Sequence, residues 1–208
     1  MKYLANLMLF SVWVSLTSAL SRPRARQEVL SLPKSAPEIH TTETCGNPAH
    51  GVPFYRTYHS AFIDHWYTPD VQRINEFLPQ GFALEGIAGL VFVTEEPGTT
   101  QLYRLYSSAA KDNYYTTSAA ERDAALKNGY APDDVSFPLT WIYPNRTCGS
   151  IPLFHLYNRL KKDNFYTISD SERVEFISNR GYADASSAVA GYVLPVGASR
   201  CSTCGLHT

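Results

Sequence analysis

The sequence has almost no excess of charge, since 18 lysines and arginines stand against 19 aspartates and glutamates and give a net charge of −1. The chain therefore lacks the basic field that attracts nucleic acid or an anionic membrane. It also lacks a long apolar run. The apolar stretch near its N-terminus is shorter than the roughly 20 residues that a bilayer requires. We expect no nucleic-acid partner and no membrane span.

Catalytic signatures are also missing. The sequence contains no G-x-S-x-G elbow, no H-E-x-x-H motif and no glycine-rich phosphate loop. We therefore predict no catalytic residue, no cofactor and no metal site. A small secreted hydrolase is the least favoured alternative, kept because carboxylates are plentiful and glycoside hydrolysis needs only two of them at one site.

Cysteine is scarce, with four residues in the chain: Cys45, Cys148, Cys201 and Cys204. An even number favours disulfides in an oxidising compartment, and three pairings are possible. If the repeats described below form a ring, a link from Cys45 to Cys201 or Cys204 follows as a corollary. Zinc is the weaker alternative, because Cys201-x-x-Cys204 with His207 nearby has no second tight cysteine pair.

The N-terminal residues 1–19 have the pattern of a secretory signal peptide, with Lys2 at the positive end, an apolar middle and small residues at the cleavage site. The proline-containing, arginine-rich segment 20–52 indicates a flexible stalk or propeptide. We therefore expect a secreted, extracellular protein. Asn145 begins the only N-x-S/T sequon, which predicts an exposed, glycosylated loop.

The body of the chain, residues 53–195, consists of three copies of one motif, and residues 196–208 form a cysteine-containing tail. The copies span about 53–95, 100–145 and 151–195. Their most regular markers are three aspartates that lie 48 and 51 positions apart: Asp64, Asp112 and Asp163. A period this steady is the signature of a repeat architecture.

Within a copy the pattern predicts a strand, a turn, a strand, a short helix, a loop and a further strand. Ser118 and Ser169 each begin an S-x-x-E capping box, and a glycine ends each predicted helix. The first copy has Thr68-Pro69 instead, with proline suited to the first helical position. There Val71, Ile74 and Leu78 form an apolar stripe.

Three such units cannot each bury an apolar face alone, so they should pack around a common axis. We predict a mostly β domain with short helices, closed with threefold pseudo-symmetry into a trefoil-like or small propeller-like shape. An open stack would leave two unprotected edges.

Several motifs recur: Tyr-Arg-x-Tyr, Asp-(His/Asn)-aromatic-Tyr-Thr, Ser-x-x-Glu-Arg and the element from Glu85 to Gly89. Together they resemble the tyrosine-rich repeat modules of unknown function found in secreted fungal and bacterial proteins. The resemblance covers residues 53–195, except that Asp133 to Pro138 replace the last element in the second copy. It implies an accessory binding role beside extracellular enzymes and no settled activity.

Polar and aromatic residues recur together on the predicted strands and form the candidate ligand-binding set: Arg56, Tyr58, Asp64, Arg104, Tyr106, Asp112, His155, Tyr157 and Asp163. Aromatic faces stack on sugar C–H surfaces while the polar groups bind hydroxyls, as in other concave sites. Threefold symmetry should keep the aspartates apart, which suits multivalent binding better than one catalytic centre. The competing interpretation is that the aspartates form turns by bonding nearby backbone.

The paired aromatics must send one ring inward in each copy, and we expect the core rings to be Tyr67, Tyr115 and Tyr166. The function we expect is a secreted, non-catalytic binding module for extracellular or cell-wall carbohydrate. The alternative is a structural or protein-interaction domain in which the same residues only build the fold. Which of the two holds depends on whether the repeated aspartates and arginines point into clefts or into the interior.

Overall fold

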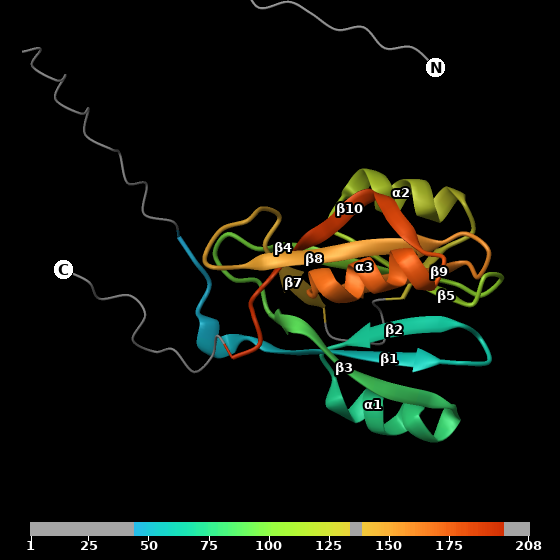
Figure 1. Cartoon of the computed structure of the whole chain (residues 1–208). Coiled ribbons are helices and arrows are strands. Elements are labelled where there is room, and N and C mark those ends of the chain that lie inside the picture. The colour runs from blue at the N-terminus through green and yellow to red at the C-terminus, as the bar shows by residue number, and fades with distance from the viewer. Residues whose placement is uncertain (1–43, 134–138, 198–208) are drawn as a thin grey trace, which may run out of the picture. The chain divides into compact units, whose positions relative to one another are not determined.

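The computed structural model describes residues 44–133 and 139–197. This part of the chain is mostly β, with three small antiparallel sheets and three short α-helices (Figure 1). The 3-10 helix Pro48–His50 precedes the first repeat, which consists of β1 (Val52–His59), β2 (Asp64–Thr68), α1 (Val71–Phe77), the 3-10 turn Leu78–Gln80 and β3 (Phe82–Val91). The second repeat consists of β4 (Thr100–Ser107), β5 (Asp112–Thr116), α2 (Ala119–Lys127), β6 (Ala131–Pro132) and β7 (Thr140–Ile142). The third consists of β8 (Ile151–Asn158), β9 (Asp163–Thr167), α3 (Asp170–Asn179) and β10 (Ala183–Val193).

Each sheet is built on the first strand of its repeat. The strand orders are β2-β1-β3, β5-β4-β6 and β10-β8-β9, and β7 also pairs with β4. The predicted sequence of strand, turn, strand, helix and strand is therefore confirmed. In the second repeat the last strand is divided into β6 and β7, and the intervening residues 134–138 lie outside the described part. This is the segment in which the sequence departs from the repeat.

The helices begin at side-chain caps, as predicted for the second and third repeats. The hydroxyls of Ser118 and Ser169 each accept the N–H three residues later. The first repeat differs from the prediction, because Asp70 is the N-cap and α1 starts two residues after Pro69. Thr68 accepts the N–H of Asp70, just as Thr116 and Thr167 accept the N–H groups of Ser118 and Ser169. A carboxylate thus replaces the serine hydroxyl, since both accept the unpaired N–H groups of a first turn.

The predicted apolar stripe on α1 is wrong except for Ile74, which is 3% exposed, whereas Val71 and Leu78 are exposed. The helix packs through Phe77 instead, whose ring centroid lies 4.7 Å from that of Trp66 on β2. The reason is the shortness of α1. In a helix of two turns, one large ring over the sheet buries more apolar area than a longitudinal stripe.

Equivalent residues of the three repeats meet in one hydrophobic core. The first strands contribute Phe54, Leu102 and Leu153, and the second strands contribute Tyr67, Tyr115 and Tyr166. The prediction that these tyrosines are core residues is confirmed, since none is more than 2% exposed. Their hydroxyls must then find partners inside the protein.

Isolated bridges join the three sheets beyond the ends of their last strands. The bridges pair Leu90 with Leu194, Phe92 with Trp141 and Tyr143 with Tyr192. Each bridge carries two backbone hydrogen bonds of 2.8–3.0 Å. Every sheet is therefore connected to both of the others.

The described disulfide joins Cys45 to Cys148. The corollary that linked Cys45 to Cys201 or Cys204 is therefore wrong, and those two cysteines lie outside the described residues. The segment before β1 runs against the end of the second repeat. The N–H that follows Cys45 in the chain donates to the hydroxyl of Tyr143 at 3.1 Å. This contact brings the Cα atoms of Cys45 and Cys148 to 5.6 Å, within disulfide range.

The predicted signal peptide, residues 1–19, and the last cysteines fall outside the described ranges. Asn145 is exposed between β7 and β8, and its glycosylation stays a prediction. Within 44–133 and 139–197 we find no helix that is both long and apolar enough to cross a membrane.

Candidate functional site

The second strands of the repeats, β2, β5 and β9, are the edge strands of their sheets, and all three contact one another. An edge strand presents N–H and C=O groups that its own sheet does not pair. Once buried, these groups need other partners, because an unpaired buried polar group is unfavourable. In this protein the partners are side chains from the neighbouring repeats.

The first set of partners is a ring of three tyrosine hydroxyls. The hydroxyl of Tyr67 donates to the carbonyl of Tyr166 and accepts its N–H, both at 2.8 Å. Tyr166 makes the same pair of bonds with Tyr115 at 2.9 Å, and Tyr115 makes them with Tyr67 at 2.9 Å. Six backbone groups are satisfied by three side chains, and each repeat is bonded to both others.

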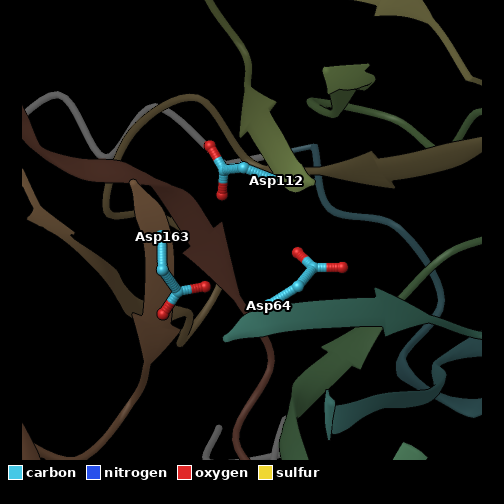
Figure 2. A group of neighbouring side chains, drawn as sticks. All are labelled: Asp64, Asp112 and Asp163. Carbon is cyan, nitrogen blue, oxygen red and sulfur yellow. The ribbon is translucent and has the colours of Figure 1, made fainter. Parts of the chain in front are cut away.

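The second set of partners is the aspartates that begin these strands. Figure 2 shows the carboxylates of Asp64, Asp112 and Asp163 pointing toward one another from three different strands. One oxygen of each lies within 4.8 Å of the others. The expectation that symmetry separates the aspartates is therefore wrong. Because β2, β5 and β9 contact one another and each begins with its aspartate, their first side chains meet.

Each carboxylate accepts hydrogen bonds from the residue that follows the next aspartate around the ring. Asp64 accepts the N–H of Asn113 at 3.1 Å and its side-chain amide at 2.8 Å. Asp112 binds Asn164 in the same way, at 2.9 and 2.6 Å. The corresponding donor to Asp163 is His65, through its N–H at 2.9 Å and its ring Nδ1 at 2.7 Å. The aspartates thus bond the backbone of another repeat and not of a nearby turn.

Two of the aspartates receive a further hydrogen bond from the tyrosine that follows the helix-ending glycine. Tyr130 donates to Asp112, and Tyr182 donates to Asp163. The first repeat has Phe82 at this position, so Asp64 has no equivalent hydroxyl. The Gly-Tyr and Gly-Phe pairs were visible in the sequence as part of the repeat, but their role required the structure.

Burial raises the pKa of Asp64 to about 6 and the pKa of Asp112 to about 8. The physical cause is the loss of hydration of the charged form, which the hydrogen bonds from Asn113 and Tyr130 only partly offset. The neighbouring carboxylates raise both values further. Asp64 and Asp112 therefore bind protons more readily in the folded protein than in an unfolded chain.

The aspartate side chains are 0–3% exposed, so their hydrogen bonds face the interior. The other predicted ligand residues lie at the three contacts between repeats. Equivalent positions at these contacts are occupied by different residues, and the three contacts consequently differ in shape.

The contact between the third and first repeats is filled. Arg56 makes two hydrogen bonds of 2.7 and 2.8 Å to the carboxylate of Glu172, and its Nε lies 2.9 Å from Glu85. Its guanidinium lies 4.8 Å from the centroid of the Phe165 ring. The ring of Phe176 on α3 also stacks on the ring of Phe165, with centroids 3.7 Å apart. Arg56 is thus held by two carboxylates and an aromatic ring.

The contact between the first and second repeats holds a cavity of about 300 Å³, called the small cavity below. Predicted ligand residues Asp64, Arg104 and Tyr106 line it together with Asn113 and the aromatic residue Phe82. The guanidinium of Arg104 donates to Asp133 at 2.6 Å.

The contact between the second and third repeats holds a cavity of about 590 Å³, called the large cavity below. Predicted ligand residues His155 and Tyr157 line it, and Tyr114, Tyr130 and Arg159 complete its wall. Tyr58, the counterpart of Tyr106 and Tyr157 in the first repeat, lines neither cavity. The structure thus brings the nine predicted residues into four places and not into three equal sites.

The large cavity exists because Ala125 stands where the other helices carry a phenylalanine. The counterparts of Ala125 are Phe77 and Phe176, four positions after Arg73 and Glu172 in the aligned repeats. Those rings cover Trp66 and Phe165, whereas in the second repeat the equivalent ring of Tyr114 is left partly exposed. A difference between a phenylalanine and an alanine thus opens the space.

Two walls of the large cavity are fixed by buried or half-buried carboxylates. Tyr114 donates to Glu121 at 3.1 Å, and Tyr130 donates to Asp112. Although burial opposes ionisation, hydrogen bonds from Ser187, Thr116 and Tyr114 lower the pKa of Glu121. Burial lowers the pKa of His155, which keeps this imidazole neutral near pH 7. Its Nε2 is hydrogen-bonded to Asn164 at 2.7 Å.

Three residues of the large cavity were not among the predicted ligand residues: Tyr114, Tyr130 and Arg159. Tyr114 belonged to the paired aromatics and Tyr130 to the repeated Gly-Tyr pair, so both were visible as repeated features. A comparison of helix residues between repeats would have shown Ala125 as the exception. Arg159 follows β8 in a turn that carries no recognisable motif.

A family model described as a domain of unknown function, DUF5648, matches residues 51–194. This agrees with the resemblance to modules of unknown function. No curated protein and no solved structure matches the chain.

Proposed function

The chain belongs to the DUF5648 family of domains of unknown function. We propose that it is a secreted, non-catalytic module that binds extracellular or cell-wall carbohydrate. The observation that carries the proposal is the large cavity, in which aromatic rings and polar groups from two repeats converge. Its volume of about 590 Å³ lies within the range of roughly 300–1,000 Å³ typical of small-molecule sites.

The aromatic part of the cavity suits a sugar. Tyr114, Tyr130 and Tyr157 are all partly exposed, so each offers a ring face to a ligand. Tyr114 and Tyr130 are already oriented by hydrogen bonds to carboxylates. Since their rings need no ordering when a ligand binds, less conformational entropy is lost on binding.

The polar part of the cavity suits hydroxyl groups. Arg159 is exposed at the cavity and offers guanidinium N–H donors. Asp184 is paired with Arg173, and its carboxylate oxygens have further lone pairs that can accept hydrogen bonds. A neutral ligand with many hydroxyl groups can accept hydrogen bonds from the guanidinium and donate hydrogen bonds to the carboxylate. Asp112 contributes indirectly, because it holds Tyr130 in place.

The buried carboxylates support a binding function over hydrolysis. Glycoside hydrolysis needs two carboxyl groups that flank the substrate. Asp64, Asp112 and Asp163 converge, but they are at most 3% exposed and are occupied by donors from neighbouring repeats. We therefore assign them to the scaffold, where they hold the repeats in register.

We also infer that the repeats form a closed domain of threefold pseudo-symmetry, trefoil-like or propeller-like. The cyclic tyrosine bonds and the three bridges between the sheets support this arrangement. The Cys45–Cys148 disulfide supports an oxidising, extracellular location, because such bonds are rare in reducing compartments.

Replacing Ala125 by phenylalanine is expected to fill the large cavity and to weaken carbohydrate binding at least about tenfold, which corresponds to 1.4 kcal/mol. Thermal stability should be unchanged or higher, because the other two helices already carry phenylalanine at this position. Binding of the purified full chain would be measured on a glycan array and on insoluble polysaccharides such as chitin, cellulose and β-glucan.

A matched pair of variants separates this site from general effects on the fold. Tyr157→Ala removes a ring from the large cavity, whereas Tyr58→Ala makes the same change at the filled contact. We expect only the first to weaken binding. If no glycan binds the wild type, or if Ala125→Phe binds as well as the wild type, the proposed function is wrong and a structural or protein-interaction role is favoured.

A further inference from the structure

The small cavity has features that its larger counterpart lacks. It lies at the equivalent contact, between the first and second repeats, and its volume is about 300 Å³. Its wall is largely aromatic and includes Phe62, Phe77 and Phe82. Phe62 is 47% exposed, which leaves one side of the cavity accessible from outside.

One of the polar residues that line this cavity is Asn113, which is 3% exposed. Its side-chain nitrogen donates to Asp64, at 2.8 Å from one oxygen and 3.1 Å from the other. Its side-chain oxygen is buried and has no hydrogen-bond partner among the described residues. An acceptor left unpaired in this way is unfavourable by about 1–3 kcal/mol, and such groups are rare in native proteins.

Comparison of the repeats explains why this oxygen has no partner. In the third repeat, the equivalent oxygen of Asn164 is bonded to Nε2 of His155 at 2.7 Å. In the second repeat the position of His155 is taken by Arg104. The Arg104 guanidinium donates to Asp133 and lies 5.2 Å from the centroid of the Trp66 ring. The second repeat therefore has no imidazole that could donate to the oxygen of Asn113, a residue that lines the small cavity.

We propose that the small cavity is a second binding site, which takes one neutral sugar ring whose hydroxyl or acetamido N–H donates to Oδ1 of Asn113. This inference rests on the proposed function and names a separate subsite and its ligand class. The volume lies at the lower end of the range for small-molecule sites, so the small cavity holds a shorter ligand than the large one.

The charges around the cavity select against an acidic ligand. Asp64 and Asp133 line it together with a single cation, Arg104, which is already engaged with Asp133. A ligand carboxylate would meet an excess of negative charge and would have to lose its hydration. A uronic acid should therefore bind more weakly than the corresponding neutral sugar.

The variant that tests the site is Asn113→His. The first repeat carries histidine at this position, and His65 donates to Asp163 through Nδ1. Histidine at position 113 therefore retains the hydrogen bond to Asp64 and removes the amide oxygen. Asn164→His makes the same substitution at the equivalent position and is the matched control. Circular dichroism and thermal melting check that both variants are folded, and Tyr106→Ala serves as a second probe of the same cavity.

The measurement is saturation-transfer NMR and titration calorimetry of the full chain with glucose, mannose, galactose, N-acetylglucosamine and glucuronate. We expect at least one neutral monosaccharide to bind the wild type and Ala125→Phe with the same affinity. The same monosaccharide should bind Asn113→His about tenfold more weakly. It should also bind the wild type more tightly than glucuronate does. If Asn113→His and Tyr106→Ala both bind the monosaccharide as tightly as the wild type does, the second site is wrong. It is also wrong if Ala125→Phe no longer binds the monosaccharide. Polysaccharide binding without any monosaccharide binding also overturns it and leaves the proposed function standing. Absence of both defeats the two proposals together.

Discussion

Replacing Tyr115 by phenylalanine is expected to lower the free energy of unfolding by about 2–6 kcal/mol, although the change removes a single oxygen atom. That oxygen accepts the N–H of Tyr67 and donates to its carbonyl. Both backbone groups are buried at the edge of β2 and would lose their partner together. Each unpaired buried group is unfavourable by about 1–3 kcal/mol, which gives the expected sum.

The hydroxyls of the other two core tyrosines make equivalent hydrogen bonds. Tyr67→Phe and Tyr166→Phe should have effects similar to that of Tyr115→Phe, because each hydroxyl bonds both backbone groups of one tyrosine in another repeat. A double variant should leave little or no stable fold, since natural domains have a total stability of only about 5–15 kcal/mol.

Urea unfolding at constant pH would measure these effects. Tyr103→Phe is the matched control, because Tyr103 is partly exposed and its hydroxyl makes no hydrogen bond within the described residues. We expect the control to differ from wild type by less than about 0.5 kcal/mol. If a phenylalanine variant of one of the three core tyrosines has the same free energy of unfolding as the control, water or a local rearrangement replaces the lost hydroxyl and the prediction is wrong.

The second large effect is on the pH dependence of stability. The folded-state pKa values of about 6 for Asp64 and about 8 for Asp112 lie above the value of roughly 4 in an unfolded chain. The folded protein therefore holds protons that the unfolded chain has released. The stability that these two carboxyl groups provide is fully present below about pH 4, and it should be lost as the pH rises through about 6 for Asp64 and about 8 for Asp112.

For Asp64 alone the full loss is about 3 kcal/mol, from 1.36 kcal/mol for each tenfold difference in proton affinity, and about half of this loss falls above pH 5. Asp112 should add to this loss at higher pH. The groups that face the cluster are Asn113, Asn164, His65, Tyr130 and Tyr182.

Glu96, Glu121 and Glu172 act in the opposite direction, because their pKa values are lowered by hydrogen bonds. The stability they provide is present above about pH 4.5 and is lost as the pH falls below their folded-state pKa. The effect of the aspartate cluster is therefore best measured between pH 5 and 8.5, where these glutamates remain ionised.

Urea unfolding at several pH values across this range would give the dependence of the free energy of unfolding on pH. Asp64→Asn and Asp112→Asn can still accept the N–H of the neighbouring repeat but no longer ionise, so each should flatten the decline. A wild type that is more stable at pH 8 than at pH 5, or asparagine variants with an unchanged slope, would contradict the prediction.

Local features of the fold could be predicted from the sequence because they depend on neighbouring residues. The caps at Ser118 and Ser169 involve residues three positions apart, and the helix-ending glycines adopt the positive φ that glycine tolerates best. The cap at Asp70 was missed, although it aligns with Ser118 in the repeat. Proline at position 69 drew attention to the wrong residue.

The three copies of one strand-rich unit and the burial of the tyrosines could be predicted from the order of the residues, because repetition and alternation are local patterns. The contacts between the units could not be predicted in this way. The hydroxyl partners of the three core tyrosines lie 48, 51 and 99 positions apart, and the aspartates converge because β2, β5 and β9 contact one another. The large cavity likewise depends on Ala125 lying opposite a strand of the next repeat, because a missing side chain creates space only where another surface encloses it.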